Sequence, residues 1–165
     1  MTVEGQTLVG LLGTGVDDEQ LLQALALLGL PRDAAGLTAM IEQAQDAADE
    51  SGEGGGVAAV PVPTRSIRLT FFHGVNAPWY LAEVSFGSPQ PGRPAGTDLP
   101  LDLSLGQSRT SVHGRLGEPT LRALFGSDRW ERPDLICCVD YDSADRVKRV
   151  HCALGPQALD RRATR

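Results

Sequence analysis

The chain has 165 residues, with 15 basic side chains against 21 acidic ones and a formal net charge of −6. This length fits one domain, or two small half-domains that share a core. Hydrophobic residues make up 41 % of the chain, enough to fill a core, which excludes wholesale disorder. A net acidic chain lacks the basic face that nucleic acids and anionic membranes require, so both are excluded as partners.

The sequence predicts a cytoplasmic protein. No stretch approaches the roughly 18 consecutive apolar residues that a membrane span needs. The start, MTVEGQTLVGLLGTG, carries Glu4 and no basic residue before its apolar run, unlike a secretory leader. The three cysteines, Cys137, Cys138 and Cys152, lack metal-type spacing, and we interpret them as reduced thiols that fill space.

Charge is divided unevenly along the chain. Residues 1–60 hold ten acidic side chains and one basic one, Arg32, whereas residues 61–165 hold eleven acidic and fourteen basic side chains. The two parts therefore carry net charges of −9 and +3. An asymmetry of this size indicates two parts with different neighbours.

The first part is predicted to be helical. Asp17 can cap a helix, with Gln20 as its capping-box partner, and Gly29 and Pro31 end that helix. Its apolar stripe is Leu21, Leu22, Leu25 and Leu28. A second helix fits Ala34–Glu50, with an apolar stripe of Leu37, Met40, Ile41 and Ala44 and an acidic opposite face. Residues 51–56 are glycine-rich and are predicted to be a flexible connector.

A hairpin is predicted to follow. Residues 66–72 alternate between apolar and other side chains, 73–78 form a turn, and 79–86 form the returning strand. Strict alternation puts Arg68 and Phe72 on one side of the first strand. On the second strand it separates Trp79, Leu81 and Glu83 from Tyr80, Ala82, Val84 and Phe86. Residues 87–97, rich in Gly and Pro, are predicted to be a loop.

The second half repeats this order. Ser108 can cap a short helix, Arg109–Leu116, which Gly117 and Pro119 end. Strands are expected near 129–130, at Leu135–Tyr141 and at 146–154. We therefore predict an α+β fold in which tandem helix-plus-hairpin units form one curved antiparallel sheet with helices packed on one face. The predicted parts are 1–56, 57–98, 99–155 and a mobile tail at 156–165.

The register of the last predicted hairpin, formed by 135–141 and 146–154, can be derived from its apolar pattern. The apolar sides of the two strands face the same core only if the numbers of each two directly opposed residues sum to an odd value. The outward face then carries Ile136, Cys138, Asp140, Val147, Arg149 and His151. Trp130 and Tyr141 are expected to fill the core of the second half.

Motifs for chemistry are sparse. No serine lies in a nucleophile elbow, and no glycine-rich loop continues into the Lys-Ser/Thr of a phosphate loop. Asp140, Asp142 and Asp145 fit an aspartate-rich turn better than a calcium loop. Cys138 beside His151 is the one arrangement that suits an enzyme. We predict no catalytic residue, no metal site and no cofactor.

The outward side of both hairpins is the predicted partner-binding surface, because arginine and aromatic side chains on a rigid sheet are favoured at protein interfaces. The candidate residues are Arg68, Phe72, Trp79, Leu81, Glu83, Asp140, Arg149 and His151. The alternative is that a helix covers this face, for instance through the Leu37/Met40/Ile41 stripe.

The run Leu99-Pro100-Leu101-Asp102-Leu103-Ser104-Leu105-Gly106-Gln107-Ser108-Arg109 continues to Arg115-Leu116-Gly117-Glu118-Pro119-Thr120. With Asp128-Arg129-Trp130 and Tyr141-Asp142, it resembles small bacterial immunity proteins of contact-dependent or polymorphic toxin systems. It is also similar to the β-lactamase-inhibitor-protein-like fold. The resemblance implies a non-enzymatic protein that binds a cognate toxin and occludes its active site. The acidic helix Ala34–Glu50 departs from the pattern. An adaptor or chaperone for a secreted effector is the alternative function.

Overall fold

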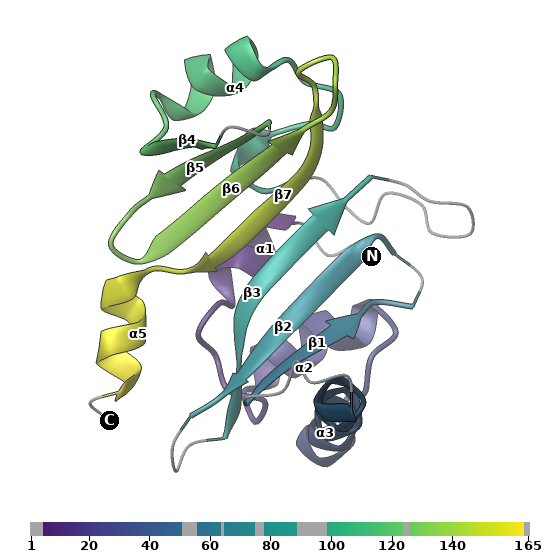
Figure 1. Ribbon diagram of the computed structural model, residues 1–165. Coiled ribbons are helices and arrows are strands. Elements are labelled where there is room, and N and C mark those ends of the chain that lie inside the picture. Colours follow the sequence, from purple (N-terminus) through teal and green to yellow (C-terminus); the bar gives the residue numbers. More distant parts are fainter. Residues whose placement is uncertain are drawn as a thin grey trace.

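The computed structural model describes residues 5–50, 56–63, 65–74, 78–88, 99–123 and 126–163. The helices are α1 (Gly5–Gly10), α2 (Glu19–Leu27), α3 (Ala34–Glu50), α4 (Arg109–Leu116) and α5 (Pro156–Ala163), with a short 3-10 helix, η1 (Pro100–Asp102). The strands are β1 (Val57–Pro61), β2 (Ile67–His73), β3 (Trp79–Gly87), β4 (Leu121–Ala123), β5 (Ser127–Glu131), β6 (Leu135–Tyr141) and β7 (Val147–Leu154). Figure 1 shows their arrangement. The predicted connector at 51–56 and loop at 87–97 lie almost wholly outside the described residues.

The predicted helices form where capping residues start and stop them. The Asp18 side chain, and not that of Asp17, accepts hydrogen bonds from the backbone N–H groups of Gln20 and Leu21 at the start of α2. In α4, Ser108 accepts from the Ser111 N–H, and Gly117 ends the helix with a φ of 82°, which favours glycine. α3 has the predicted bounds. α1 was not predicted.

Within the described residues, the strands form one open antiparallel sheet in the order β1-β2-β3-β7-β6-β5-β4. The predicted α+β class with a single antiparallel sheet is therefore confirmed. Each half is a meander, β1–β3 or β4–β7, and the two meanders meet where β3 pairs with β7. The edge strands β1 and β4 were not predicted. They make each half larger than a hairpin.

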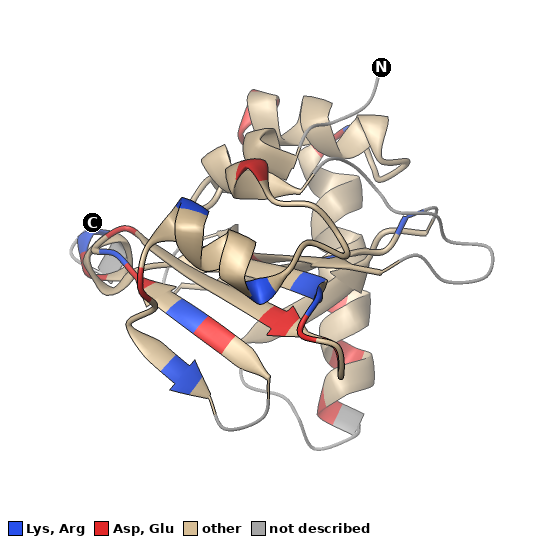
Figure 2. Ribbon diagram, turned by 90° about the horizontal axis from the view of Figure 1, so that it is seen from above, with Lys and Arg blue, Asp and Glu red and all other residues tan. Residues whose placement is uncertain are grey.

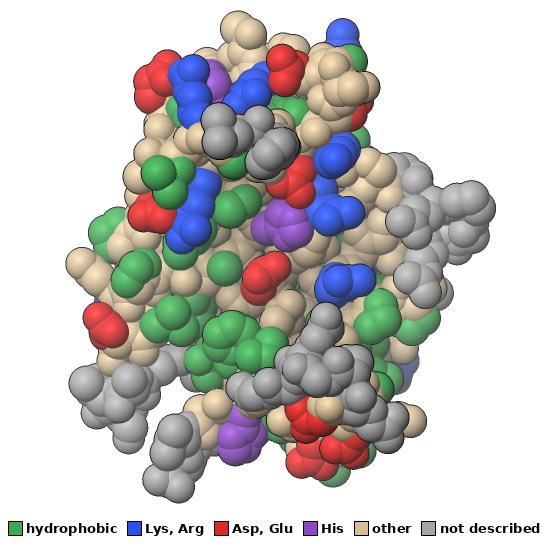
Figure 3. Space-filling view, viewed as in Figure 1, with side chains coloured by type: hydrophobic (Ala, Val, Ile, Leu, Met, Phe, Trp, Pro, Cys, Tyr) green, Lys and Arg blue, Asp and Glu red, His purple; other side chains and the backbone are tan. Residues whose placement is uncertain are grey.

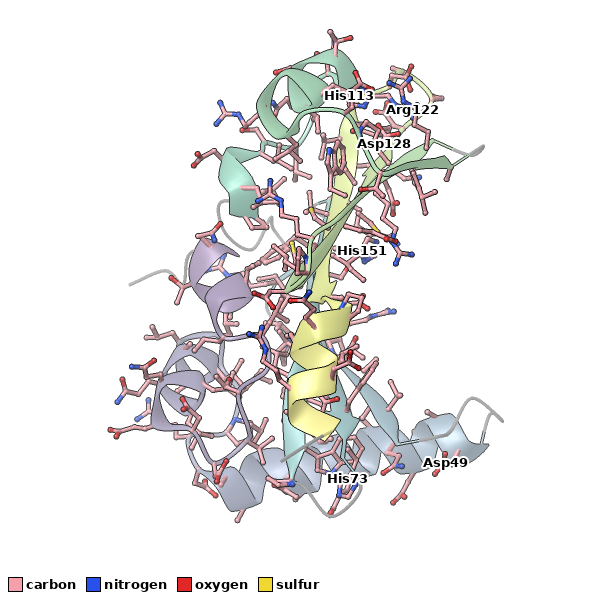
Figure 4. All side chains as sticks on the ribbon, turned by 90° about the vertical axis from the view of Figure 1, so that its left-hand side faces the viewer. Asp49, His73, His113, Arg122, Asp128 and His151 are labelled. Atoms are coloured by element: carbon pink, nitrogen blue, oxygen red, sulfur yellow. The ribbon has the colours of Figure 1, made fainter. Side chains whose placement is uncertain are left out.

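Helices α1, α2 and α4 cover one face of the sheet, as the edge-on view in Figure 4 shows. Their apolar residues join the inward residues of the strands in one core, including Leu8, Leu25, Phe71, Val112 and Val139. Trp130 and Tyr141 belong to this core, as predicted. Such burial is the main stabilising contribution to the fold. No helix in the described part of the chain is long and apolar enough to cross a membrane.

Helix α3 lies against β1 at one edge of the sheet (Figures 1 and 4). Leu37 and Ile41 are fully buried in the main core, so this stripe does not cover the outward side of the sheet. The far end of α3, where Asp49 is labelled in Figure 4, reaches past the sheet toward its uncovered side. The alternative in which this helix hides the outward face is therefore not what the structure has.

The C-terminal segment differs from the prediction of a mobile tail, because Pro156–Ala163 forms helix α5. Ala158 and Leu159 of α5 pack on a small second cluster formed by Tyr80, Ala82 and Leu154. Burial of these apolar side chains stabilises the segment as a helix.

Figure 2 shows the charge division in space. Acidic residues recur along the helices of the first part, whereas basic residues are concentrated in the second half, on both its strands and its helices. The uneven charge along the sequence thus becomes an uneven charge over the molecule.

Candidate protein-binding face

One face of the sheet is left uncovered by α1, α2, α3 and α4, apart from the corner at Tyr80 where α5 packs, and we call it the open face. Strand alternation and register place the following side chains on its five inner strands: Arg68, Thr70, Phe72, Tyr80, Glu83, Ser85, Ser127, Arg129, Glu131, Ile136, Cys138, Asp140, Arg149, His151 and Ala153. Figure 3 views this face directly, with a histidine near its middle among acidic and basic side chains.

His151 is the centre of a charged network on the open face. Its Nε2 lies 3.1 Å from Oδ2 of Asp140 on β6, and its Nδ1 lies 3.5 Å from Oε1 of Glu83 on β3. The hydrogen bond to Asp140, followed by that to Glu83, raises the pKa of His151 to about 9. The imidazole is therefore charged at neutral pH.

Asp140 is held as a carboxylate by the same network. The hydrogen bond from His151 is the largest cause that lowers its pKa, and the Ser127 hydroxyl adds a second hydrogen bond of 2.7 Å. Glu83 belongs to the first half of the sheet and Asp140 to the second, so His151 links the halves across β3, β7 and β6.

Arginines surround this network. Arg149 is directly opposite Asp140 in the register and is exposed, and Arg68 is exposed on β2. Arg129 forms an ion pair of 2.9 Å with Glu131 on its own strand, and both side chains remain partly open to solvent. The open face thus presents alternating charges on a rigid backbone, a pattern suited to complementary contacts with another protein.

An aromatic corner borders the charged centre. Phe72 is half-buried and meets Tyr80 edge to face, with ring centroids 6.1 Å apart. The structure therefore keeps six of the predicted residues on one face: Arg68, Phe72, Glu83, Asp140, Arg149 and His151.

The prediction that Trp79 and Leu81 are surface contact residues is wrong. Trp79 is 4 % exposed and Leu81 is fully buried, and both belong to the main core. A β-bulge interrupts the register, so Thr70 pairs with Glu83 while Phe71 pairs with Leu81. Ala82 is the extra residue of the bulge, and it reverses the side of the sheet on which the preceding residues of β3 lie.

The bulge lies where β3 changes neighbours. Residues 83–87 of β3 pair with β7. Before them, Leu81 both donates and accepts backbone hydrogen bonds with the segment after α1, and the Trp79 carbonyl accepts one from the same segment. The sequence contains a signal of this change, because Trp79-Tyr80-Leu81-Ala82 is continuously apolar before alternation resumes at Glu83.

A second bulge, between Asp140 and Tyr141, turns Val147 inward, where it is buried. The expectation that Val147 faces outward is therefore also wrong.

Cys138 and His151 are directly opposite each other, as the predicted register requires. Burial is the largest cause that raises the pKa of Cys138, whereas an activated thiol nucleophile needs a lowered pKa. His151 already has a carboxylate at each ring nitrogen. This geometry does not favour a thiol–imidazole catalytic pair.

A second charged cluster, which sequence reasoning missed, anchors α4 to the sheet. The fully buried Asp128 accepts hydrogen bonds from Arg109 Nε at 2.9 Å and Nη2 at 2.6 Å, and its Oδ2 lies 2.6 Å from His113 Nε2. Burial by itself raises the pKa of Asp128, but the hydrogen bonds from Arg109 and His113 outweigh it and lower the pKa. The signal available in the sequence is the spacing of Asp128 and Trp130, which strand alternation places on the same inward side of a strand.

Comparison of the chain with protein-family models, curated proteins and solved structures finds no match.

Proposed function

We propose that the protein is an immunity protein that binds a cognate protein toxin through the open face and blocks the toxin's active site. The observation that carries this proposal is the uncovered sheet face with its ordered Glu83–His151–Asp140 network. An ordered surface avoids much of the entropy cost of fixing side chains on binding, which is what a tight inhibitor needs.

The net negative charge of the molecule supports a basic toxin as the partner. The chain carries a net charge of −6, and the acidic C-terminal half of α3 stands at the β1 edge of the open face (Figure 4). An acidic inhibitor attracts a basic toxin, such as a nuclease, by electrostatic steering. The aromatic corner at Phe72 supplies apolar contact area beside the charged centre.

The test uses the product of the adjacent gene as the candidate toxin. Its activity is measured with increasing amounts of this protein, and the affinity is measured in parallel. We expect stoichiometric inhibition. Binding without inhibition would support the adaptor or chaperone alternative, and full activity in the presence of excess protein would contradict the proposal.

Two charge reversals assign the contact to the open face. Arg149→Glu changes an exposed arginine at its centre and is expected to weaken binding roughly tenfold or more, since it removes a charged contact and adds repulsion. Arg32→Glu, the matched control, changes an exposed arginine between α2 and α3 and leaves affinity within about twofold. Equal losses in both variants would rule out the open face as the contact.

A further inference from the structure

A solvent-open cavity of about 460 Å³ lies at the outer end of the second half, between α4, β4 and the β6–β7 turn. Small-molecule sites have volumes of roughly 300–1,000 Å³. Its lining is polar and includes Arg109, Arg122, Arg146, His113, Ser108 and Thr110. His113, Asp128 and Arg122 lie together at this end of the sheet in Figure 4, away from His151. The cavity is therefore separate from the open face.

Two of the lining side chains are held in place before any ligand arrives. Arg109 and His113 both bond to the buried Asp128, which fixes the positions of the guanidinium and the imidazole. The Arg109 guanidinium also lies 5.0 Å from the ring centre of Tyr141.

The walls of the cavity are joined by backbone contacts. The Arg109 N–H donates to the Asp145 carbonyl at 2.9 Å, and Ser108 forms an isolated bridge with Arg146. These contacts tie the first turn of α4 to the β6–β7 hairpin. The cavity therefore has a defined shape, as a selective site requires.

The charges of the lining favour an anion. Three guanidinium groups line the cavity with one carboxylate, that of Asp145, which is 67 % exposed; the buried Asp128 behind Arg109 and Glu118 beside Arg122 each offset one of the three charges. Arg146 donates through Nη1 to the Gly106 carbonyl, a neutral acceptor that leaves its charge uncompensated at that contact. Arg122 pairs with Glu118 on the surface, where both side chains are more than half exposed, and such pairs are weak enough to exchange.

We propose that this cavity binds the phosphate group of a small polar phosphorylated compound. A phosphate monoester offers three oxygens that can accept from guanidinium groups arriving from α4, β4 and the β6–β7 turn, whereas a carboxylate satisfies one planar fork. The hydroxyls of Ser108 and Thr110 are further donors in the lining. The volume exceeds that of a phosphate ion, so a polar body such as a sugar has room beside it.

The test is a nuclear magnetic resonance titration of the whole chain with ribose 5-phosphate, inorganic phosphate and citrate. We expect saturable shifts confined to residues 108–113, 121–123 and 144–146, with ribose 5-phosphate bound more tightly than citrate. Equal binding of citrate would overturn the choice of phosphate. Shifts that spread over the surface and do not saturate would overturn the site.

Matched variants locate the site. Arg146→Gln and Arg122→Gln are each expected to weaken ribose 5-phosphate binding roughly tenfold, as loss of a charged hydrogen bond does. Arg115→Gln is the control: Arg115 is on α4, which borders the cavity, but it pairs with Asp102 and does not line the cavity. Because Arg122 is well exposed, its variant keeps the fold even if Arg146→Gln disturbs the turn. Unchanged affinity in Arg122→Gln, or an equal loss in Arg115→Gln, would refute the proposal.

Discussion

His151 differs from an ordinary surface histidine because both of its ring nitrogens face carboxylates. Glu83 of β3 and Asp140 of β6 flank it, Cys138 is opposite it in the register, and Arg149 is near Asp140. The two carboxylates outweigh partial burial and raise the pKa of His151 to about 9. Protonation of this one side chain is therefore linked to the stability of the folded protein.

We predict that the wild-type protein loses stability as pH rises. The folded-state pKa of His151 lies above its unfolded value of 6.5, so the contribution is complete below pH 6.5 and disappears by about pH 9. Because each pKa unit corresponds to about 1.4 kcal/mol and solvent screens part of it, we expect a loss of about 1–2 kcal/mol. Urea unfolding at pH 6.5 and 9.5 measures it. The variant His151→Gln should lose that much less over the same interval; an identical loss would contradict the role of His151.

Asp128 provides a second prediction, because its fully buried carboxylate has Arg109 and His113 as partners. Asp128→Asn keeps the shape but removes the charge, which leaves Arg109 without its buried counter-ion, and we expect a loss of about 3–5 kcal/mol in the free energy of unfolding.

The control for this prediction is Asp145→Asn. Asp145 is 67 % exposed and lies 3.5 Å from Arg109, so its substitution should change stability by less than about 0.5 kcal/mol. Asparagine also tolerates the positive φ at this position. Similar costs for both variants in urea unfolding would mean that the buried cluster is not specially stabilising.

At the level of elements, local sequence signals predicted α3 and α4 correctly, whereas features that depend on distant residues were missed. α3 and α4 form where apolar spacing and end residues predicted them, because those signals act within a few residues. The bulge at Ala82 depends on a change of neighbouring strand that involves residues near position 15. Alternation within 79–86 was correct after the bulge and inverted before it, which is why six contact residues stayed on one face and two did not.

The bulge predicts different costs for two leucine truncations. Leu81→Ala removes a fully buried side chain and should lower the free energy of unfolding by about 2–5 kcal/mol. Leu121→Ala, on the edge strand β4, removes a side chain that is 55 % exposed and should cost less than about 0.5 kcal/mol. Urea unfolding compares them. A small cost for Leu81→Ala would place that residue on the surface and contradict the bulge.

At the level of the whole molecule, the two meanders share one sheet and one core. The seam between β3 and β7 is reinforced on the open face by the Glu83–His151 contact. The main core contains Leu25 and Phe71 of the first half together with Val112 and Val139 of the second. Two halves that share a core in this way should unfold together.

The two tryptophans test this cooperativity, because Trp79 lies in the first half and Trp130 in the second. In Trp79→Phe and in Trp130→Phe, the fluorescence of the remaining tryptophan should have the same urea midpoint as far-ultraviolet circular dichroism of that variant. A fluorescence midpoint well apart from the dichroism midpoint, in either variant, would show halves that unfold independently.

The positions of α2, α3 and α4, the antiparallel class of the sheet and the odd-sum pairing of residues 135–140 with 149–154 followed from residue order, since capping and periodicity are short-range effects. The burial of Trp79 and Leu81, the Asp128 cluster, the docking of α5 and the partners of His151 did not. Each of these depends on which distant segments become neighbours, and that choice is made by packing of the whole core.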